Sequence, residues 1–261
     1  MRLFTALLLL GFTLSAQAAI QTREIPYQAS DGTQMVGYLA YDDARSGARP
    51  GVLVVHEFWG LNDYAKRRAR DLAALGYSAM AIDMYGGGKV GHHPDEARGF
   101  MQEALKNAHS AKARFQAAFE LLKQQPQTDP TKIAAIGYCF GGRVVLDMAR
   151  QGMPLAGVAA FHAPLGTATP AQPGGVKAKV LVEHGGADKL VPAEAVTAFK
   201  EEMDKAGVDY KFVVQAGAKH SFTNPEADEV HKGHGLDVGY DKNADEKSWA
   251  DLQAFFKEIF G

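Results

Sequence analysis

Three side chains that could act together in nucleophilic catalysis lie far apart along the chain: Cys139, Asp188 and His220. A thiolate can attack a carbonyl carbon, and a histidine that titrates near neutral pH can exchange protons with the thiol and with the leaving group. A carboxylate beside the histidine orients its ring and stabilises the imidazolium form. If the fold brings the three together, they can cleave an acyl bond.

Cys139 stands in the segment Gly-Tyr-Cys-Phe-Gly-Gly, residues 137–142, between a β-like apolar run at 132–136 and a helix-like run at 143–150. This is the layout of the nucleophile elbow G-x-S-x-G with Cys in place of Ser. A residue pushed out of so tight a turn leaves no room for Cβ atoms at the flanking positions, which explains the glycines. The alternatives are a phosphate cradle, whose motifs do not fit this spacing, or a plain crossing with a buried, inert Cys.

The apolar and turn patterns predict an α/β protein with a mostly parallel central sheet and helices on both faces. We expect strands over residues 22–28, 34–41, 52–55, 77–82, 132–136, 157–161, 179–183 and 210–214. We expect helices over residues 63–75, 95–124, 143–150, 193–206 and 244–259, with a loop from the last strand to about residue 243. In this fold class, active groups lie at the carboxyl ends of the strands.

Each candidate residue follows a predicted strand. Cys139 comes after the strand at 132–136, Asp188 after the strand at 179–183, and His220 after the strand at 210–214. The chain order of nucleophile, acid and histidine is that of the α/β-hydrolases. Taken singly, Asp188 could be an ordinary loop carboxylate and His220 one of nine histidines on the surface. Three residues at three matching strand ends favour a catalytic set.

Four segments together resemble dienelactone hydrolase: residues 137–142, His-Glu-Phe-Trp-Gly at 56–60, His-Gly-Gly-Ala-Asp at 184–188, and His-Ser-Phe at 220–222. The resemblance covers nearly all of the chain after its first residues. It implies an α/β-hydrolase fold and an ester or lactone hydrolase of the carboxymethylenebutenolidase class. It also implies a triad of Cys139, Asp188 and His220 that works through an acyl-thioenzyme.

The same resemblance assigns further roles near the nucleophile. It implies that Glu57 contacts Cys139 and helps to ionise the thiol, and that the backbone N–H groups of Phe140 and Phe58 form the oxyanion hole. The alternative for Glu57 is a carboxylate that favours a helix start.

Candidate substrate contacts are Arg98, Tyr85, Trp59 and Phe222, and His162 could also line the pocket. The family's enzyme holds a substrate carboxylate with arginines, and Arg98 lies where one could fall. The segment 221–225, just after the catalytic histidine, has no arginine and departs from that pattern. Aromatic residues at strand ends could equally be plain packing.

The first residues carry one arginine, an apolar core and Ala-Gln-Ala at 16–18. This pattern predicts a signal peptide over residues 1–18, cut after Ala18 or Ala19, and a single domain over 19–261. The alternative is an uncleaved anchor, although the apolar stretch is short for a membrane span. The mature protein is therefore expected to be exported, to the periplasm in a bacterial cell, without stable membrane insertion.

Composition narrows the choice of partners. The chain has 261 residues, a net charge of −2 and a single cysteine, so it forms no internal disulfide, and nothing in its charge argues for nucleic acid or an anionic membrane surface as a partner. Residues 220–237 contain several His, Asp and Glu, but their spacing fits no zinc pattern, and no metal or cofactor is expected. We expect a small ester or lactone substrate. The alternatives are a non-catalytic binding protein on the same fold, or a thioesterase or peptidase.

Overall fold

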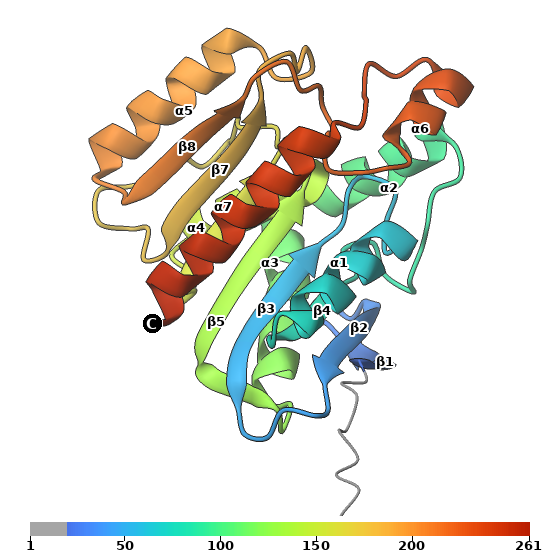
Figure 1. The fold of residues 1–261 in the computed structure, drawn as a ribbon, viewed down its shortest axis with the longest axis vertical. Coiled ribbons are helices and arrows are strands. Elements are labelled where there is room, and N and C mark those ends of the chain that lie inside the picture. The colour runs from blue at the N-terminus through green and yellow to red at the C-terminus, as the bar shows by residue number, and fades with distance from the viewer. Residues whose placement is uncertain (1–19) are drawn as a thin grey trace, which may run out of the picture.

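A computed structural model describes residues 20–261, which form one eight-stranded sheet (Figure 1). The strands are β1 (Ile20–Gln28), β2 (Gln34–Asp42), β3 (Arg49–Val55), β4 (Ser78–Ile82), β5 (Thr128–Tyr138), β6 (Gly157–Phe161), β7 (Lys179–Gly185) and β8 (Tyr210–Gln215). Their order across the sheet is β1-β2-β4-β3-β5-β6-β7-β8. Strand β2 pairs antiparallel with β1 and β4, and every other pair is parallel. The predicted α/β class with a mostly parallel sheet is confirmed.

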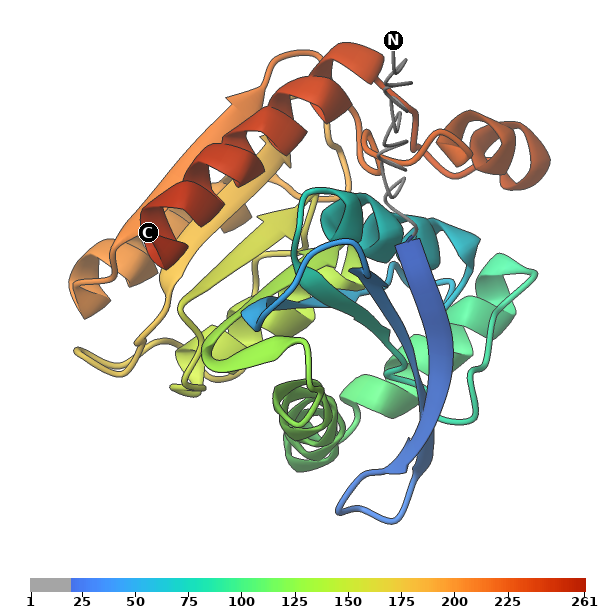
Figure 2. The same ribbon diagram turned by 60° about the horizontal axis from the view of Figure 1, so that its bottom comes forward.

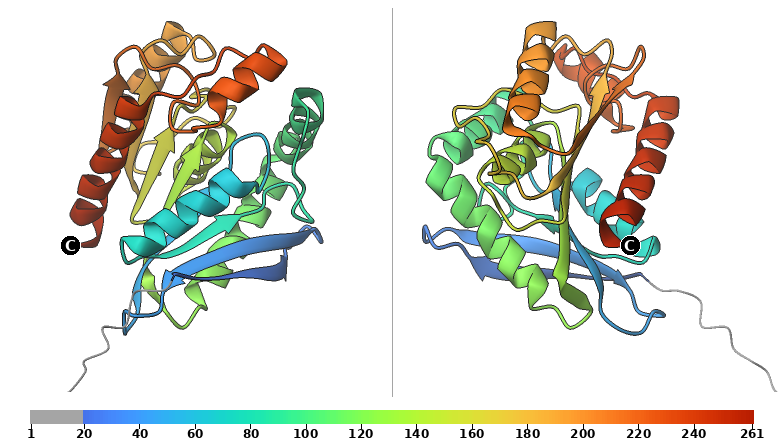
Figure 3. Two further views of the ribbon diagram at one scale, coloured as in Figure 1. Left: turned by 45° about the vertical axis from the view of Figure 1, so that its right-hand side comes forward. Right: turned by 90° about the vertical axis from the view of Figure 1, so that its left-hand side faces the viewer.

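The described residues also form seven helices, of which the first five lie between strands and the last two follow β8: α1 (Asp63–Ala74), α2 (Pro94–Leu105), α3 (Ala108–Lys123), α4 (Phe140–Arg150), α5 (Ala193–Ala206), α6 (Ala227–His234) and α7 (Lys242–Phe260). Helices α1 and α7 cover one face, whereas α3, α4 and α5 cover the other, as the views in Figure 3 show. The β1–β2 pair lies at one edge of the sheet and β8 at the opposite edge (Figure 2).

The two layers follow from alternation along the buried strands. In β3, Val52 and Val54 belong to the core cluster that includes α1 and α7, while Leu53 and Val55 belong to the cluster on the other face. All four side chains are fully buried. A parallel strand covered on both faces needs apolar residues at every position, which is why the sequence shows a continuous run there.

Two sequence-based expectations about helices were wrong. The single helix expected over residues 95–124 is two helices, because the backbone of Asn107 is extended and its side chain accepts a hydrogen bond from the N–H of His109, at 2.9 Å. This capping interaction starts α3 as a separate helix. The second error is α6, which lies in the expected loop before residue 243. It spans eight residues and ends at Gly235 in the left-handed conformation.

The turn between β5 and α4 is packed against the end of β3. A Cβ atom on Gly137 would lie 2.1 Å from the carbonyl oxygen of Gly141, and one on Gly141 would lie 2.3 Å from the carbonyl oxygen of Val55. Both obstacles are backbone atoms, which cannot move aside as a flexible side chain can. The glycines are therefore required by close approach, as the sequence pattern indicated.

We predict that Gly141→Ala lowers the free energy of unfolding by about 1–3 kcal/mol or more, the cost of overpacking a dense site. Gly99→Ala is the matched control. It lies within α2 with open space around its Cβ position, and is expected to stabilise the protein by up to about 1 kcal/mol. Urea unfolding of both variants measures the difference, and equal stabilities would contradict the crowding argument.

Candidate active site

Cys139 lies on the sharp turn between β5 and α4, with φ 52° and ψ −117°. This conformation is strained for a residue with a side chain, and such strain is often concentrated at active sites. The Cys139 N–H donates to the carbonyl of Phe161 on the neighbouring strand, at 3.0 Å. Phe140 is the first residue of α4, where a backbone N–H has no partner within the helix.

Cys139 is not the only residue with a strained backbone conformation. In the part of the chain that the structure describes, the non-glycine residues with positive φ are Cys139, His162 and Ser221, with φ of 52°, 40° and 59°. They follow β5, β6 and β8, at the carboxyl edge of the sheet. The surrounding structure must hold each of them in place, so this edge is the part of the fold most specialised for a site.

His220 and Asp188 form the central buried pair. The Nδ1 atom of His220 lies 2.8 Å from Oδ2 of Asp188, whose Oδ1 accepts a further hydrogen bond from the N–H of Leu190 at 2.9 Å. Burial alone would lower the pKa of His220. The negative charge of a Cys139 thiolate and hydrogen bonds with Asp188 and Cys139 outweigh burial and raise the pKa to about 10. The imidazolium form is thus favoured when the thiol is ionised.

His162 lies behind His220 and is not among the residues that line the cavity. It is fully buried, with its ring edge-on to that of His220 at a centroid distance of 5.1 Å. Its Nε2 atom lies 2.8 Å from Oγ1 of Thr223. Burial, and then the positive charge of His220, hold the pKa of His162 well below its ordinary value. A neutral imidazole therefore packs against the ring of His220.

Glu57 is buried at the end of β3, beside the loop that carries His220. Its carboxylate accepts hydrogen bonds from Oγ of Ser221 at 2.9 Å and from Nδ2 of Asn224 at 2.7 Å. Burial raises the pKa of Glu57, although these two hydrogen bonds and the charge of His220 oppose the shift. The hydrogen bonds of Glu57 in this structure thus run to the His220 loop, and no contact with Cys139 is among those described.

Two buried side chains fix the loop of residues 56–59. The His56 ring donates from Nδ1 to the carbonyl of Glu57 at 2.5 Å, and its Nε2 accepts from the N–H of Met84 at 3.2 Å. The hydroxyl of Tyr85 donates to the carbonyl of Phe58 at 2.9 Å. Tyr85, expected in the substrate pocket, is buried and holds the Phe58 backbone from behind.

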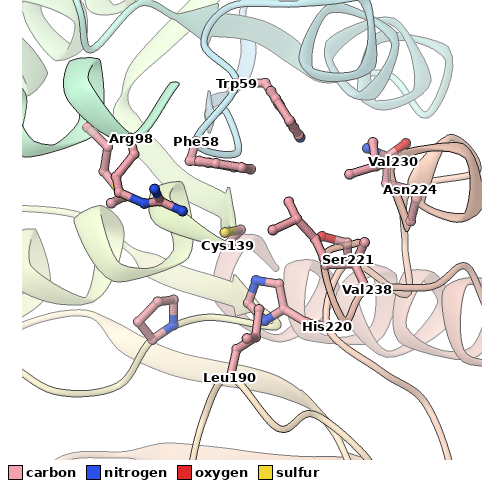
Figure 4. Close-up of a pocket in the computed structure, with 14 residues that line it drawn as sticks. Phe58, Trp59, Arg98, Cys139, Leu190, His220, Ser221, Asn224, Val230 and Val238 are labelled. Carbon is pink, nitrogen blue, oxygen red and sulfur yellow. The ribbon is translucent and has the colours of Figure 1, made fainter. Parts of the chain in front are cut away.

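A cavity of about 250 Å³ opens above Cys139 (Figure 4). Most of its lining is apolar, and it consists of Phe58, Trp59, Arg98, Met101, Cys139, Pro164, Leu190, His220, Ser221, Asn224, Ala227, Val230, Leu236 and Val238. Trp59 and Arg98 therefore line the cavity. Phe222 does not, because its side chain is fully buried and packs against His162.

Sequence reasoning missed Asn224 as a partner of Glu57 and Val230 as part of the wall. Asn224 lies four residues after His220, and the absence of an arginine from this segment was the available signal. Val230 lies on α6, and nothing in the sequence pattern placed that helix over the cavity.

Residues 20–261 offer neither a metal site nor a helix that could span a membrane. No group of three or more His, Cys, Asp or Glu side chains in this range could hold a metal ion. No helix there has the length and apolar character needed to cross a bilayer. The predicted signal peptide, residues 1–18, lies outside the described residues.

Comparisons with known proteins agree with this arrangement. The model of the dienelactone hydrolase family matches residues 35–260. "Protein usf" of Aquifex pyrophilus is 30% identical over 234 residues, which cover 87% of this chain and 95% of that protein. The dienelactone hydrolase-like promiscuous phosphotriesterase P91, from metagenomic libraries, is 37% identical with a TM-score of 0.85, covering 93% of this chain and 100% of that one. A structure named m3DLH is 38% identical with a TM-score of 0.87 and the same coverage. The predicted resemblance and the α/β-hydrolase fold are confirmed.

The buried carboxylate of Glu57 leads to a prediction about stability and pH. Because its pKa is raised in the folded state, that state binds more protons than the unfolded one above pH about 4.3, the ordinary value for Glu. Ionisation of Glu57 therefore lowers the free energy of unfolding as pH rises from that point. Glu57→Gln has no such loss, since Gln can still accept from Asn224 and donate to Ser221.

The stability of Glu57→Gln relative to the wild type should thus increase between pH 4 and pH 8. Thermal unfolding at a series of pH values measures it, with Glu229→Gln, at an exposed carboxylate on α6, as the control. A difference between Glu57→Gln and wild type that stays constant with pH would show that the carboxylate is not perturbed.

Proposed function

Because the chain belongs to the dienelactone hydrolase family and is a hydrolase of esters or lactones, we propose that Cys139, His220 and Asp188 are its catalytic triad. One observation carries the proposal. Cys139, on a strained turn that opens into the cavity, lies close enough to His220 to raise its pKa, while Asp188 holds the other side of the ring. The triad side chains come from three loops at one edge of the sheet, as triad chemistry requires.

In the first half of the reaction, the Cys139 thiolate attacks the carbonyl carbon of the ester, and the carbonyl oxygen becomes an oxyanion. The backbone N–H groups of Phe140 and Phe58 donate to that oxyanion. As the tetrahedral intermediate collapses, the C–O bond to the leaving group breaks, and His220 gives its proton to the departing alkoxide. For an ester, the products are a free alcohol and an acyl-thioenzyme. For a lactone, the new hydroxyl stays on the opened chain, which is itself the acyl group on Cys139.

In the second half, His220 removes a proton from water, and the resulting hydroxide attacks the thioester carbonyl. The C–S bond breaks, the carboxylic acid leaves, and the thiolate–imidazolium pair of Cys139 and His220 is restored. Asp188 keeps Nδ1 of His220 protonated throughout, so Nε2 is the atom that takes and gives the proton. Each step conserves atoms and charge without a metal or a redox partner.

We propose that Glu57 assists the first ionisation of the thiol, as the family resemblance implies. A buried carboxylate whose pKa is raised is a better proton acceptor than an exposed one. To reach the thiol, the carboxylate would have to leave its hydrogen bonds with Ser221 and Asn224.

A second candidate activity is the hydrolysis of phosphotriesters. One observation favours it: the protein named as a promiscuous phosphotriesterase is 37% identical and matches 93% of this chain. Attack by the same thiolate on phosphorus would form a P–S bond and break one P–O bond, and His220 would protonate the departing alkoxide. Water would then hydrolyse the S-phosphorylated Cys139. The oxyanion donors suit a phosphoryl oxygen as well as a carbonyl oxygen.

Cys139→Ala is predicted to reduce kcat for ester hydrolysis by about 10⁴–10⁶-fold, the range expected when a nucleophile is removed from a triad. Cys139→Ser should be weak as well, because a hydroxyl is a poorer nucleophile than a thiolate in this site. The assay uses short p-nitrophenyl esters, and a phosphotriester in parallel, on variants whose thermal unfolding matches the wild type.

Labelling by iodoacetamide provides an independent check. Cys139 is the sole cysteine, so the labelling rate reports on one thiol, and His220→Gln should slow it. Full activity in a folded Cys139→Ala protein would contradict the nucleophile assignment. Fast labelling of Cys139 without turnover of esters, thioesters, peptides or phosphotriesters would favour a binding protein on this fold.

We also propose that the protein is exported, with residues 1–18 as a signal peptide, on the sequence pattern described above. Expression of the full chain in a bacterium, followed by fractionation and N-terminal sequencing, is expected to give a periplasmic protein that starts at Ala19 or Ile20. A start at Met1 in that fraction would rule out cleavage.

A further inference from the structure

The side of the cavity next to α6 is apolar and carries no free charge. Ala227 and Val230 of α6, with Leu236 and Val238 just after it, form this part of the lining. Two polar residues, Ser221 and Asn224, line the same cavity, and each donates a hydrogen bond to the carboxylate of Glu57. A substrate group bound on the α6 side of the cavity therefore contacts mainly aliphatic side chains.

The one cationic side chain among the lining residues, apart from His220, lies across Cys139 from α6. In Figure 4, Arg98 lies on one side of Cys139, and Val230 and Asn224 lie on the other. The guanidinium of Arg98 is half-exposed and donates to Asp95 at 2.8 Å. The α6 side therefore offers no partner to a carboxylate, which would lose its hydration there without compensation.

A second cavity, of about 270 Å³, lies next to the first. Three residues line both cavities: Trp59, Asn224 and Val230. The ring of Trp59 packs against Phe58 at a centroid distance of 4.3 Å and against His234 of α6 at 6.1 Å. Trp59 and Val230 thus form a partition one side chain thick between the cavity above Cys139 and the outer cavity.

We propose that the α6 side of the active-site cavity binds an uncharged apolar group of the substrate, and that Trp59 and Val230 determine the specificity by limiting its length. The proposal rests on the proposed hydrolase function and names its substrate class, short neutral esters. The cavity above Cys139 has a volume of about 250 Å³, just below the ~300–1,000 Å³ typical of ligand pockets. This small size supports a short substrate. On the α6 side, truncating Val230 would join the inner cavity to the outer one.

The first test is a chain-length series of p-nitrophenyl esters of straight-chain acids. For the wild type, kcat/KM is expected to fall beyond a limiting length. Val230→Ala should move that limit to longer chains and raise kcat/KM for the first esters beyond it by about fourfold per added methylene, the factor that burial of one CH₂ provides. Val230→Leu, which enlarges the same wall, should move the limit to shorter chains.

Met101→Ala is the matched control, because Met101 lines the inner cavity but not the outer one. It should leave the length limit where the wild type has it. If Met101→Ala moves the limit and Val230→Ala does not, the substrate group lies on the opposite side and the proposal is wrong. A wild type with no length limit would overturn it equally.

The second test compares a neutral ester with a half-ester of a dicarboxylic acid of the same length. The wild type should hydrolyse the neutral ester with at least about tenfold higher kcat/KM, since a single methylene in an apolar pocket already discriminates by this much. Preference for the anion, lost in Arg98→Gln, would overturn the proposal and assign the substrate carboxylate to Arg98.

These outcomes are distinct from failure of the proposed function. If the wild type hydrolysed none of the esters, both the function and this inference would fall. If the wild type hydrolysed the esters through Cys139, but the Val230 variants left the chain-length limit unchanged, the proposed function would stand and only this inference would be wrong.

Discussion

The close approach between the β5–α4 turn and the end of β3 is the constraint on which the site depends. Gly141 lies so near to this strand that a Cβ atom would meet the carbonyl oxygens of Val55 and His56 at 2.3 and 2.6 Å. This contact locks the turn to the strand end, and Cys139 keeps its strained backbone because both flanks are fixed. Phe58 and Phe140 follow these two locked segments, so the spacing of their N–H groups is set before any substrate arrives.

Around this frame, burial and neighbouring groups together decide which side chains carry charge. His220 is held toward its imidazolium form by Cys139 and Asp188, whereas His162 behind it stays neutral because it is buried beside a positive ring. Glu57 is buried with a raised pKa and is held by two neutral donors from the His220 loop. Titratable groups in contact thus have pKa values pushed in different directions, a pattern typical of sites that move protons.

Much of the fold and the positions of the candidate triad could be predicted from the sequence, for physical reasons. Strands buried on both faces appear as continuous apolar runs, and parallel strands share one carboxyl edge, so residues after the runs could be expected to meet there. The glycines at 137 and 141 indicate the crowding at the turn between β5 and α4. The family resemblance added Glu57 and the oxyanion donors, which spacing alone does not identify.

The rest depends on contacts between distant segments. The capping interaction of Asn107 that separates α2 from α3 is one hydrogen bond within an otherwise helical pattern. The short helix α6 contains Gly233, ends at Gly235 and is rich in charged residues, a composition that equally suits a loop. Whether His162 faces the cavity or lies behind His220 depends on a local backbone strain that residue type does not reveal. Small local energies and long-range packing decide these features, so a single sequence does not display them.

If Cys139 is the nucleophile, it carries the acyl group during turnover. The most direct measurement is rapid quenching of the wild type with an ester whose acyl-enzyme breaks down slowly, followed by mass spectrometry of the intact protein and of its peptides. The expected result is a mass increase of one acyl group in place of one hydrogen, located on the peptide that contains Cys139. An acyl group found instead on Ser221, whose hydroxyl lies beside the same cavity, would contradict it. Turnover with no covalent adduct, under conditions in which deacylation is rate-limiting, would contradict it as well.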